Sequence, residues 1–234
     1  MSIVSLSDSG HFFGLLPNVT WGMLQQATLE TLFMAFASAA AVSVLGMILG
    51  LLLFLTSPGQ ALSAPWFYRP FVLVVNTMRA IPFIIMVVLL LPVSKLLVGT
   101  TLGPTAILPA LIIGASPFYA RMVEIALKEV DKGVLEAAKA MGCTLFQTIF
   151  KVLLPESSPA LVSGLAVTTI LMVGFTAMAG FVGGGGLGDL AYNLGHQRGM
   201  VDVTLCATLI ILAIVSLVQF AADLIARRLD KRYR

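Results

Sequence analysis

The chain has 234 residues, of which 59% are hydrophobic and only 11% are charged, with a formal net charge of +3. Soluble globular domains carry about 25% charged residues, so this composition, with a mean hydropathy of +1.01, excludes an ordinary water-soluble domain. The length suits one compact membrane bundle rather than two domains.

Five apolar stretches are long enough to cross a membrane, which takes about 20 residues for roughly 30 Å of hydrocarbon. They are solidly apolar and do not alternate, which favours helices over a β-barrel. The expected spans cover about residues 31–57, 70–94, 96–120, 157–182 and 203–224. The sequence therefore predicts an all-α integral membrane protein with five transmembrane helices.

The remaining segments follow from these spans. We expect residues 1–27 to lie outside the membrane or in its interface, without the basic start of a signal peptide. Residues 28–226 form the transmembrane domain, and 227–234 form a basic cytoplasmic tail that acts as a stop-transfer anchor or touches anionic lipid. One side of the predicted spans holds 11 Lys and Arg residues and the other side two. By the positive-inside rule, the N-terminus is outside and the C-terminus is cytoplasmic.

Arg79 is the one ionisable residue well inside a predicted span, and such residues are functional candidates by default. Two interpretations stay open for it and for the nearby Asn76. The guanidinium orients an anionic group of a solute in an aqueous pathway, or it bonds to the backbone near Pro82 or reaches the cytoplasmic interface. The spans contain no carboxylate chain for a proton relay and no acid ring for a cation filter, which argues against ion coupling and conduction.

A charged stretch at residues 121–156 holds ten of the 25 charged residues of the chain and lies between apolar runs. Asp131 is expected to cap a short helix over residues 132–141. Gly142 then suits a left-handed position at the end of this helix. The stretch therefore predicts a cytoplasmic loop that contains helical structure.

A second short helix is expected to follow at once. Thr144 and Gln147 have the form of a capping box, and the helix is expected to end at Leu153, before Pro155. It carries an apolar stripe at helical spacing. One interpretation is a pair of angled helices that inserts into a soluble partner, and the alternative is an interfacial amphipathic helix that only closes the bundle.

The span at 157–182 is rich in small and weakly polar residues. Ser158 and Pro159 predict its start, as N-cap and first helical residue. Small residues permit tight helix packing, and lining of a pathway is the alternative that stays open. The pathway candidates in this span are Thr169, Met172 and Thr176.

A run of glycines follows this span on the outer side and formally fits Gly-x-Gly-x-x-Gly. A dinucleotide site needs a strand before such a run, whereas an apolar helix precedes it here. We therefore favour a flexible helix exit or an outer gate, because glycine permits positive φ and close backbone approach. The candidate gate positions are Gly183, Gly184, Gly185, Gly186 and Gly188.

Motifs for chemistry on this chain are missing from the sequence. It contains no Gly-x-x-x-x-Gly-Lys-Ser/Thr, no His-Glu-x-x-His and no Gly-x-Ser-x-Gly, so another chain must bind any nucleotide that drives this protein. Cys143 and Cys206 are expected too far apart to bond. We predict no catalytic site, no metal site and no nucleic-acid partner.

One motif in the charged stretch resembles the EAA loop of type I ABC importer permeases. It consists of Glu136, Ala137, Ala138, Gly142, Leu154 and Pro155. The family usually has Ile two residues before the Leu-Pro pair, whereas this chain has Val152. Within that class, residues 76–85, 97–103 and 183–188 are most similar to permeases of D/L-methionine importers, and the resemblance covers about residues 15–225.

The resemblance implies the type I ABC importer transmembrane fold, with coupling helices between the third and fourth spans, in a bacterial inner membrane. It implies a homodimer of this chain, two cytoplasmic ATP-binding subunits and an external substrate-binding protein or lipoprotein. ATP and Mg²⁺ are expected on the ATPase, with no cofactor on this chain, and the six motif residues are the expected coupling positions.

The expected function is therefore the permease of an ATP-driven methionine importer that works by alternating access. Two alternatives stay open. The first is an importer of the same class for another amino acid or a small organic anion. The second is an ATP-independent channel or secondary transporter.

Overall fold

The structure is a computed structural model that describes residues 18–229. This part of the chain is helical and contains no β-strand. Short π-helical segments occur at Ile149–Leu153 and Leu190–His196, and a 3-10 turn occurs at Gly180–Val182. The α-helices are α1 (Trp21–Thr56), α2 (Pro65–Ala80), α3 (Phe83–Val98), α4 (Pro104–Lys128), α5 (Lys132–Ala140), α6 (Leu145–Thr148), α7 (Leu154–Ala179), α8 (Gly186–Asp189) and α9 (Val201–Leu229).

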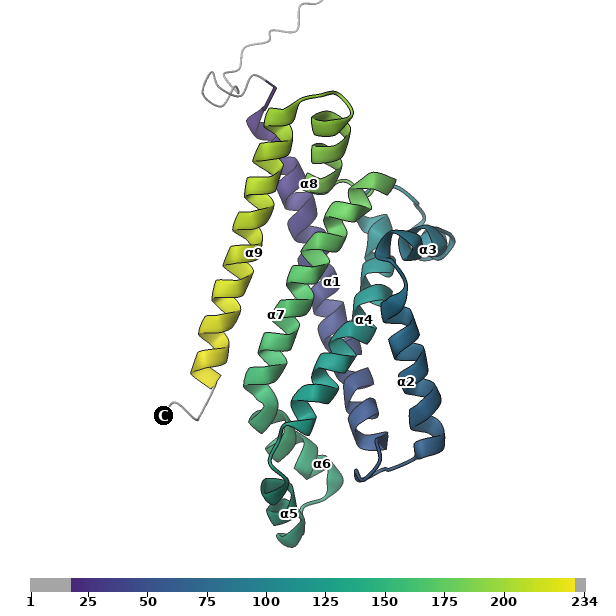
Figure 1. The fold of residues 1–234 in the computed structure, drawn as a ribbon, viewed down its shortest axis with the longest axis vertical. Coiled ribbons are helices and arrows are strands. Elements are labelled where there is room, and N and C mark those ends of the chain that lie inside the picture. Colours follow the sequence, from purple (N-terminus) through teal and green to yellow (C-terminus); the bar gives the residue numbers. More distant parts are fainter. Residues whose placement is uncertain (1–17, 230–234) are drawn as a thin grey trace, which may run out of the picture.

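The long helices form an elongated bundle, with α5 and α6 at one end and α8 at the other (Figure 1). Four helical runs are long and apolar enough to cross a membrane, and a fifth span results if α2 and α3 are counted as one broken span. The prediction of an all-α membrane protein is confirmed. The start of α2 and the C-terminal ends of α4 and α9 lie toward the end of the bundle that carries α5 and α6 (Figure 1).

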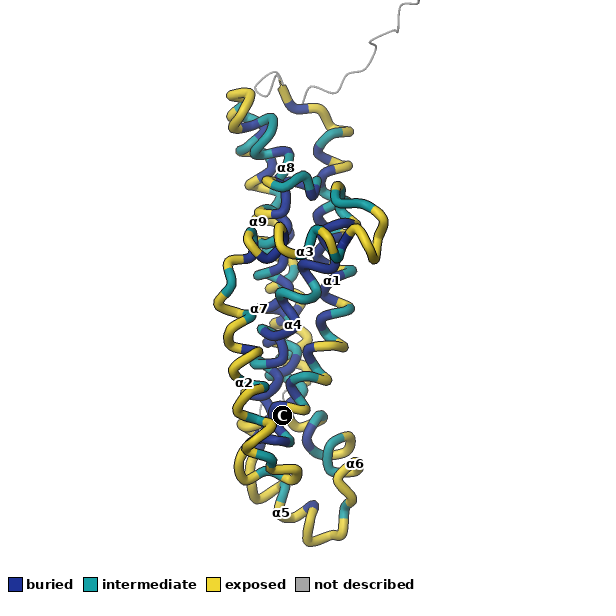
Figure 2. The backbone as a smooth tube through the Cα atoms, turned by 90° about the vertical axis from the view of Figure 1, so that its right-hand side faces the viewer, coloured by how far each residue is buried: buried dark blue, intermediate teal, exposed yellow. Residues whose placement is uncertain are grey.

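Helix α4 lies at the centre of the core and packs against α1, α3 and α7. Glycines on α1 allow a very close approach, since a Cβ at Gly50 would lie 2.5 Å from the Cβ of Val123. Buried residues follow the interior of α1, α4 and α7, whereas α2 is mostly exposed (Figure 2). The exposed apolar faces of the single chain are the surfaces that lipid or another chain must cover.

The second predicted span is not one straight helix. Helix α2 ends at Ala80, α3 begins at Phe83, and the two axes differ by 106°. Ile81 is extended, with ψ of 125°, because the ring of Pro82 disfavours helical backbone at the residue before it. The predicted span at 70–94 therefore bends halfway, and the third span begins at Pro104 rather than near residue 96.

The charged loop is shorter than the sequence predicts, because α4 continues to Lys128. Arg121 and Lys128 pair with Glu124 from positions three before it and four after it, so these charges satisfy one another within the helix. The connecting element therefore begins at Glu129.

The predicted helix start at Ser158 and Pro159 is also wrong. The helical run continues from Leu145 to Val182, and both residues lie inside it. In the π-helical turn, the N–H of Leu154 donates to the carbonyl oxygen of Ile149, five residues earlier. The π-helical turn already interrupts the regular i to i−4 hydrogen bonds at the point where Pro155 has no N–H to donate. The helix therefore continues through the proline.

The boundaries of the terminal segments also differ. Helix α1 begins at Trp21, so residues 21–27 are its first turns rather than a separate segment, and α9 continues to Leu229. Residues 1–17 of the predicted N-terminal segment and residues 230–234 of the predicted tail lie outside the described residues.

Candidate coupling surface and solute pathway

The segment that carries the EAA motif, residues 129–155, starts with the predicted short helix. The Asp131 carboxylate accepts hydrogen bonds from the N–H of Gly133 at 2.7 Å and of Val134 at 3.3 Å, which caps α5. Gly142 has φ of +76°, and its N–H donates to the carbonyl of Lys139. The cap and the left-handed glycine are confirmed.

The second helix of this EAA segment starts as predicted. The N–H of Thr144 donates to Oε1 of Gln147 at 2.9 Å, and the N–H of Gln147 donates to the Thr144 hydroxyl at 3.3 Å. This capping box satisfies two donors that a helix start leaves free. Only Gly142 and Cys143 separate Met141, at the end of α5, from this cap, so the chain reverses within a few residues.

One face of the EAA segment is held by the bundle and the other is exposed. Leu153 is buried in the main core, and Leu135 packs against that core. Glu136 and Ala137 are exposed, whereas Ala138 is buried. The exposed apolar side chains of the segment are Val134, Met141, Leu145, Phe146 and Phe150. Apolar side chains gathered on a polar, water-facing end of a membrane protein are typical of a protein interface.

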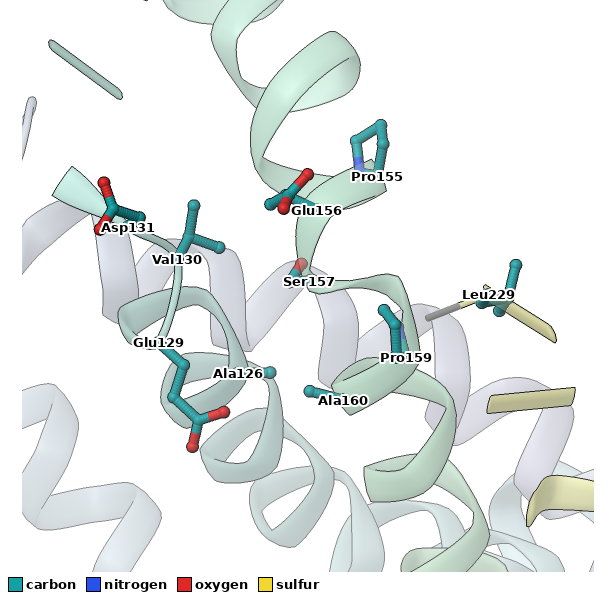
Figure 3. Close-up of a pocket in the computed structure, with 10 residues that line it drawn as sticks. All are labelled: Ala126, Glu129, Val130, Asp131, Pro155, Glu156, Ser157, Pro159, Ala160 and Leu229. Carbon is teal, nitrogen blue, oxygen red and sulfur yellow. The ribbon is translucent and has the colours of Figure 1, made fainter. Parts of the chain in front are cut away.

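A cavity separates the two ends of the EAA segment. A cavity of about 230 Å³ lies between the end of α4 and the start of α7, and Figure 3 shows the residues that line it. Glu129 and Asp131 border it on one side, Pro155 and Glu156 on the other, and Leu229 of α9 closes it. The motif residue Pro155 is exposed, and Leu154 is half-buried against the core. The segment thus joins the bundle through two stems that do not pack tightly against each other.

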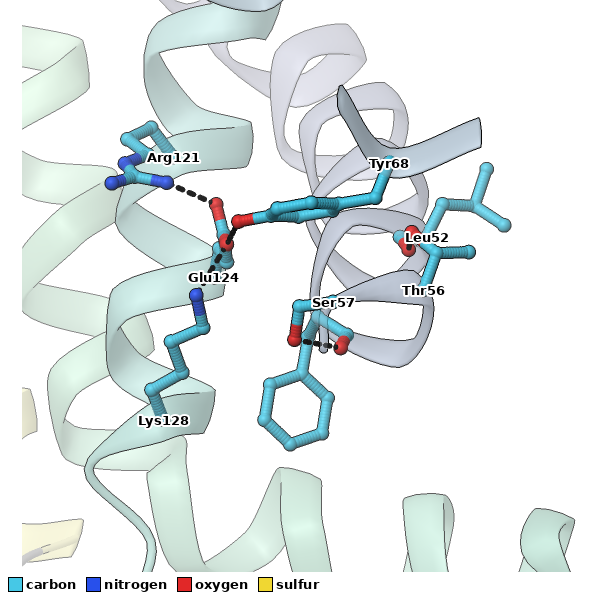
Figure 4. A network of polar contacts seen from close by, with 8 residues as sticks. Leu52, Thr56, Ser57, Tyr68, Arg121, Glu124 and Lys128 are labelled. Atoms are coloured by element: carbon cyan, nitrogen blue, oxygen red, sulfur yellow. Dashed lines mark hydrogen bonds and ion pairs between the residues drawn. The ribbon is translucent and has the colours of Figure 1, made fainter. Parts of the chain in front are cut away.

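An ionic cluster around the buried Glu124 lies next to the EAA segment and was missed by the sequence analysis. The Glu124 side chain has no exposed surface and accepts from Arg121 at 2.5 Å and from Lys128 at 2.7 Å. Its third partner is the hydroxyl of Tyr68 in α2, at 2.9 Å (Figure 4). The i, i+3 and i, i+4 spacing of the charges was the signal available in the sequence. The cluster fastens α2 to the end of α4 that leads into α5.

The pathway candidates do not converge in the described chain. Asn76 and Arg79 are exposed on α2, and the Arg79 guanidinium lies over the Phe118 ring, 5.4 Å from its centroid. Thr169 and Thr176 donate to carbonyls of their own helix at 2.8 and 2.7 Å, as their position in α7 allows. Met172 has no exposed surface. A pathway role for these five residues stays a prediction.

The glycine run forms a turn that is hydrogen-bonded to α1. The N–H of Gly186 donates to the Glu30 carboxylate at 2.8 Å, and the N–H of Leu187 donates to the Thr31 hydroxyl at 2.9 Å. A Cβ at Gly188 would lie 2.3 Å from the carbonyl oxygen of Ala177, so the backbones of α7 and α8 are in contact. Positive φ at Gly183, Gly185 and Gly186 and close backbone approach are confirmed. The role of the turn as a gate stays a prediction.

Two carboxylates face the outer side of this turn. Glu30 is half-buried inside α1, and with Asp189 it borders a cavity of about 360 Å³. Burial raises the pKa of Asp189, and the charge of Glu30 adds to this effect, whereas the hydrogen bond from Asn193 opposes it. Within residues 18–229, no group of three or more His, Cys, Asp and Glu is placed to hold a metal, and both cysteines are free.

Comparison with known proteins places the chain among transport proteins. Residues 43–234 match the family described as binding-protein-dependent transport system inner membrane component. The methionine import system permease protein MetP of Bacillus subtilis is 55% identical over 216 residues, covering 92% of this chain and 97% of that protein. The probable D-methionine transport system permease protein MetI of Pasteurella multocida is 44% identical, covering 91% and 98%.

A solved structure shares the fold. A chain of the MetNI methionine ABC transporter, in an inward-facing conformation, superimposes with a TM-score of 0.88 at 41% identity and covers 90% of this chain and 98% of that chain. This protein therefore belongs to the family of inner membrane components of binding-protein-dependent transport systems.

Proposed function

We propose that this chain is the permease subunit of an ATP-driven importer that carries methionine into a bacterial cell by alternating access. The names of its relatives support methionine as the solute. The likeness to a methionine ABC transporter chain over 90% of this chain supports the importer class. The chain itself is a transport subunit and not an enzyme.

The observation that carries the proposal is the geometry of the EAA segment. Two short helices meet at Gly142 and present an exposed glutamate, an exposed alanine and several apolar side chains beyond the end of the bundle. We infer that a separate ATPase receives this surface in a cleft and binds ATP and Mg²⁺ itself. The glycine run supports no nucleotide site on this chain, because α7 and not a strand precedes it.

The proposed assembly contains two copies of this chain, two ATPase subunits and an external substrate-binding protein or lipoprotein. The bias of basic residues toward the end with α5 and α6 supports a cytoplasmic location for that end. Exposed apolar faces on α2 and α9 support burial against lipid and a second copy. The coupling positions are then Glu136, Ala137, Ala138, Gly142, Leu154 and Pro155.

The coupling role is tested by Gly142→Asp in the purified complex. Aspartate at φ of +76° is strained and adds charge at the junction of the two helices, so co-purification with the ATPase and ATP-dependent uptake should both fall. Gly59→Asp is a matched control, because Gly59 has φ of +81° in the loop at the same end of the bundle. Normal assembly and uptake in the Gly142 variant would exclude the coupling role.

The solute is tested in proteoliposomes that contain the complex and its binding protein. Uptake of labelled L-methionine should require ATP and should be reduced by unlabelled methionine. A panel that includes D-methionine and other amino acids separates the proposal from an importer for a different solute. Uptake without ATP or the ATPase would support a channel or secondary transporter instead.

A further inference from the structure

A cavity of about 210 Å³ lies at the bend between α2 and α3. Its walls come from the end of α2, the start of α3, the middle of α4 and the outer part of α7. Liquid water occupies about 30 Å³ per molecule, so this volume equals roughly seven waters and suits a ligand of the size of one amino acid. None of the proposed coupling residues lines it.

The cavity has one charged wall residue, Arg79. Every ion pair among residues 18–229 involves Glu124, so no carboxylate of the described chain neutralises this guanidinium. Its contact is the face of the Phe118 ring, with 5.4 Å from the guanidinium carbon to the ring centroid, and this contact leaves the edge with its N–H donors available. A carboxylate is the group that such a fork binds best.

The rest of the cavity lining is aromatic and apolar. Phe83 and Phe175 stack with ring centroids 4.1 Å apart and an angle of 2° between their planes. The Met86 sulfur lies beside Gly114, where an added Cβ would come within 3.0 Å of it. Part of the cavity therefore exists because Gly114 has no side chain. Aromatic rings and thioethers form favourable contacts with an unbranched apolar or thioether side chain.

The broken backbone supplies the third type of group. Helix α2 ends at Ala80, and the last carbonyl oxygens of a helix have no partner within that helix. They also carry the negative end of the helix dipole, which favours a cation nearby. Broken membrane helices in transporters use such freed backbone groups to hold polar parts of a solute. An ammonium group placed here lies on the same cavity as the guanidinium.

We propose that this cavity binds the transported amino acid on the permease itself. Its carboxylate pairs with Arg79, its ammonium faces the carbonyl oxygens at the end of α2, and its side chain packs against Phe83 and Phe175. The inference rests on the proposed function, from which it takes the class of solute. It means that the permease selects the solute a second time, after the binding protein has delivered it.

The test measures binding of labelled L-methionine to the purified permease–ATPase complex without binding protein. Arg79→Gln should weaken binding at least about tenfold, since a hydrogen bond to a charged group accounts for that much. Gly114→Leu should abolish it by filling the cavity. Arg69→Gln, a loss of the same charge ten residues earlier on the exposed face of α2, should change nothing. Methionine bound elsewhere in the complex is the same in both arginine variants, so their difference reports the cavity.

Methionine methyl ester, which lacks the carboxylate charge, completes the test. The wild-type complex should bind the ester as weakly as the Arg79→Gln complex binds methionine. The Arg79→Gln substitution should not weaken binding of the ester any further. If the wild-type complex takes up methionine with ATP but Arg79→Gln and Gly114→Leu bind methionine as the wild type does, the proposed binding site is wrong and the importer function stands. A wild-type complex that neither transports nor binds methionine overturns both.

Discussion

The hydroxyl of Tyr68 in α2 donates a hydrogen bond of 2.9 Å to Glu124 in α4, whose side chain has no exposed surface. Val75 is the one buried residue of α2, and it packs with Leu53 of α1 and Ala120 of α4. Three residues beyond Lys128, Asp131 caps α5. The Glu124 carboxylate therefore adds a polar link between the helix that carries Arg79 and the end of α4 that leads into the EAA segment (Figure 4).

Removing the hydroxyl of Tyr68 should weaken the contact between α2 and α4 without creating a cavity in the core. For Tyr68→Phe we expect a loss of about 1 kcal/mol of stability, because Glu124 keeps both cations as partners. The number of ATP molecules hydrolysed per methionine transported should rise. Thermal unfolding in detergent and paired ATPase and uptake assays measure the two effects. Tyr192→Phe, at a ring in the outer π-helical segment, is the control, and equal behaviour of the two variants would contradict the role of the bond.

The glycine turn should not accept a single methyl group. Gly188→Ala places Cβ against the Ala177 backbone, and backbone cannot rotate away as a side chain can. We expect a loss of more than about 2 kcal/mol, seen as low yield and aggregation in size-exclusion chromatography. In Gly174→Ala, on α7, Cβ meets no atom within 4 Å, and this variant should fold normally. A monodisperse Gly188→Ala protein would show that the turn is looser than described.

Loss of the α5 cap should weaken coupling locally. Asp131→Ala leaves the N–H groups of Gly133 and Val134 without their acceptor and should cost about 1 kcal/mol in α5. Amide hydrogen exchange should then quicken at the start of α5, and affinity for the ATPase should fall. Asp131→Asn retains a capping oxygen and should behave as wild type. If the alanine and asparagine variants exchange alike, the cap does not stabilise α5.

Asp189 should make stability depend on pH. Burial raises its pKa above the reference of 3.8, so the folded state favours the protonated acid. This contribution is complete below about pH 3.8 and is lost as the pH rises through the raised value. Asp189→Asn should therefore unfold at a higher temperature than wild type at pH 7 and at the same temperature at the acid end. An asparagine variant that is less stable at pH 7 would mean that the ionised group is favourably bound.

Local signals in the sequence were sufficient for the EAA segment. The Asp131 cap, the left-handed Gly142 and the capping box of Thr144 and Gln147 each involve residues at most four apart, and the structure contains all of them. Overall helicity and the apolar runs were equally clear. These features depend on backbone preferences that no distant contact overrides.

Features set by distant contacts were not predictable in this way. Charges at Arg121 and Lys128 suggested a loop, but Glu124 and Tyr68 complete a cluster that keeps them helical. The prolines at 155 and 159 suggested a boundary that the π-helical turn removes. The position of Glu30 against the glycine turn joins residues 156 apart in the sequence, and no local pattern indicates such a pairing.

The run from Leu145 to Val182 contains 38 residues, which at 1.5 Å per residue is roughly 57 Å, almost twice the hydrocarbon thickness of a bilayer. One end of this run lies at the proposed coupling surface, and the other adjoins the glycine turn. A lever of this length turns a tilt of about 10° into a displacement of about 10 Å at its far end. A tilt driven at the end with α5 and α6 can therefore displace the far end of the same helical run directly, because the run moves as one element.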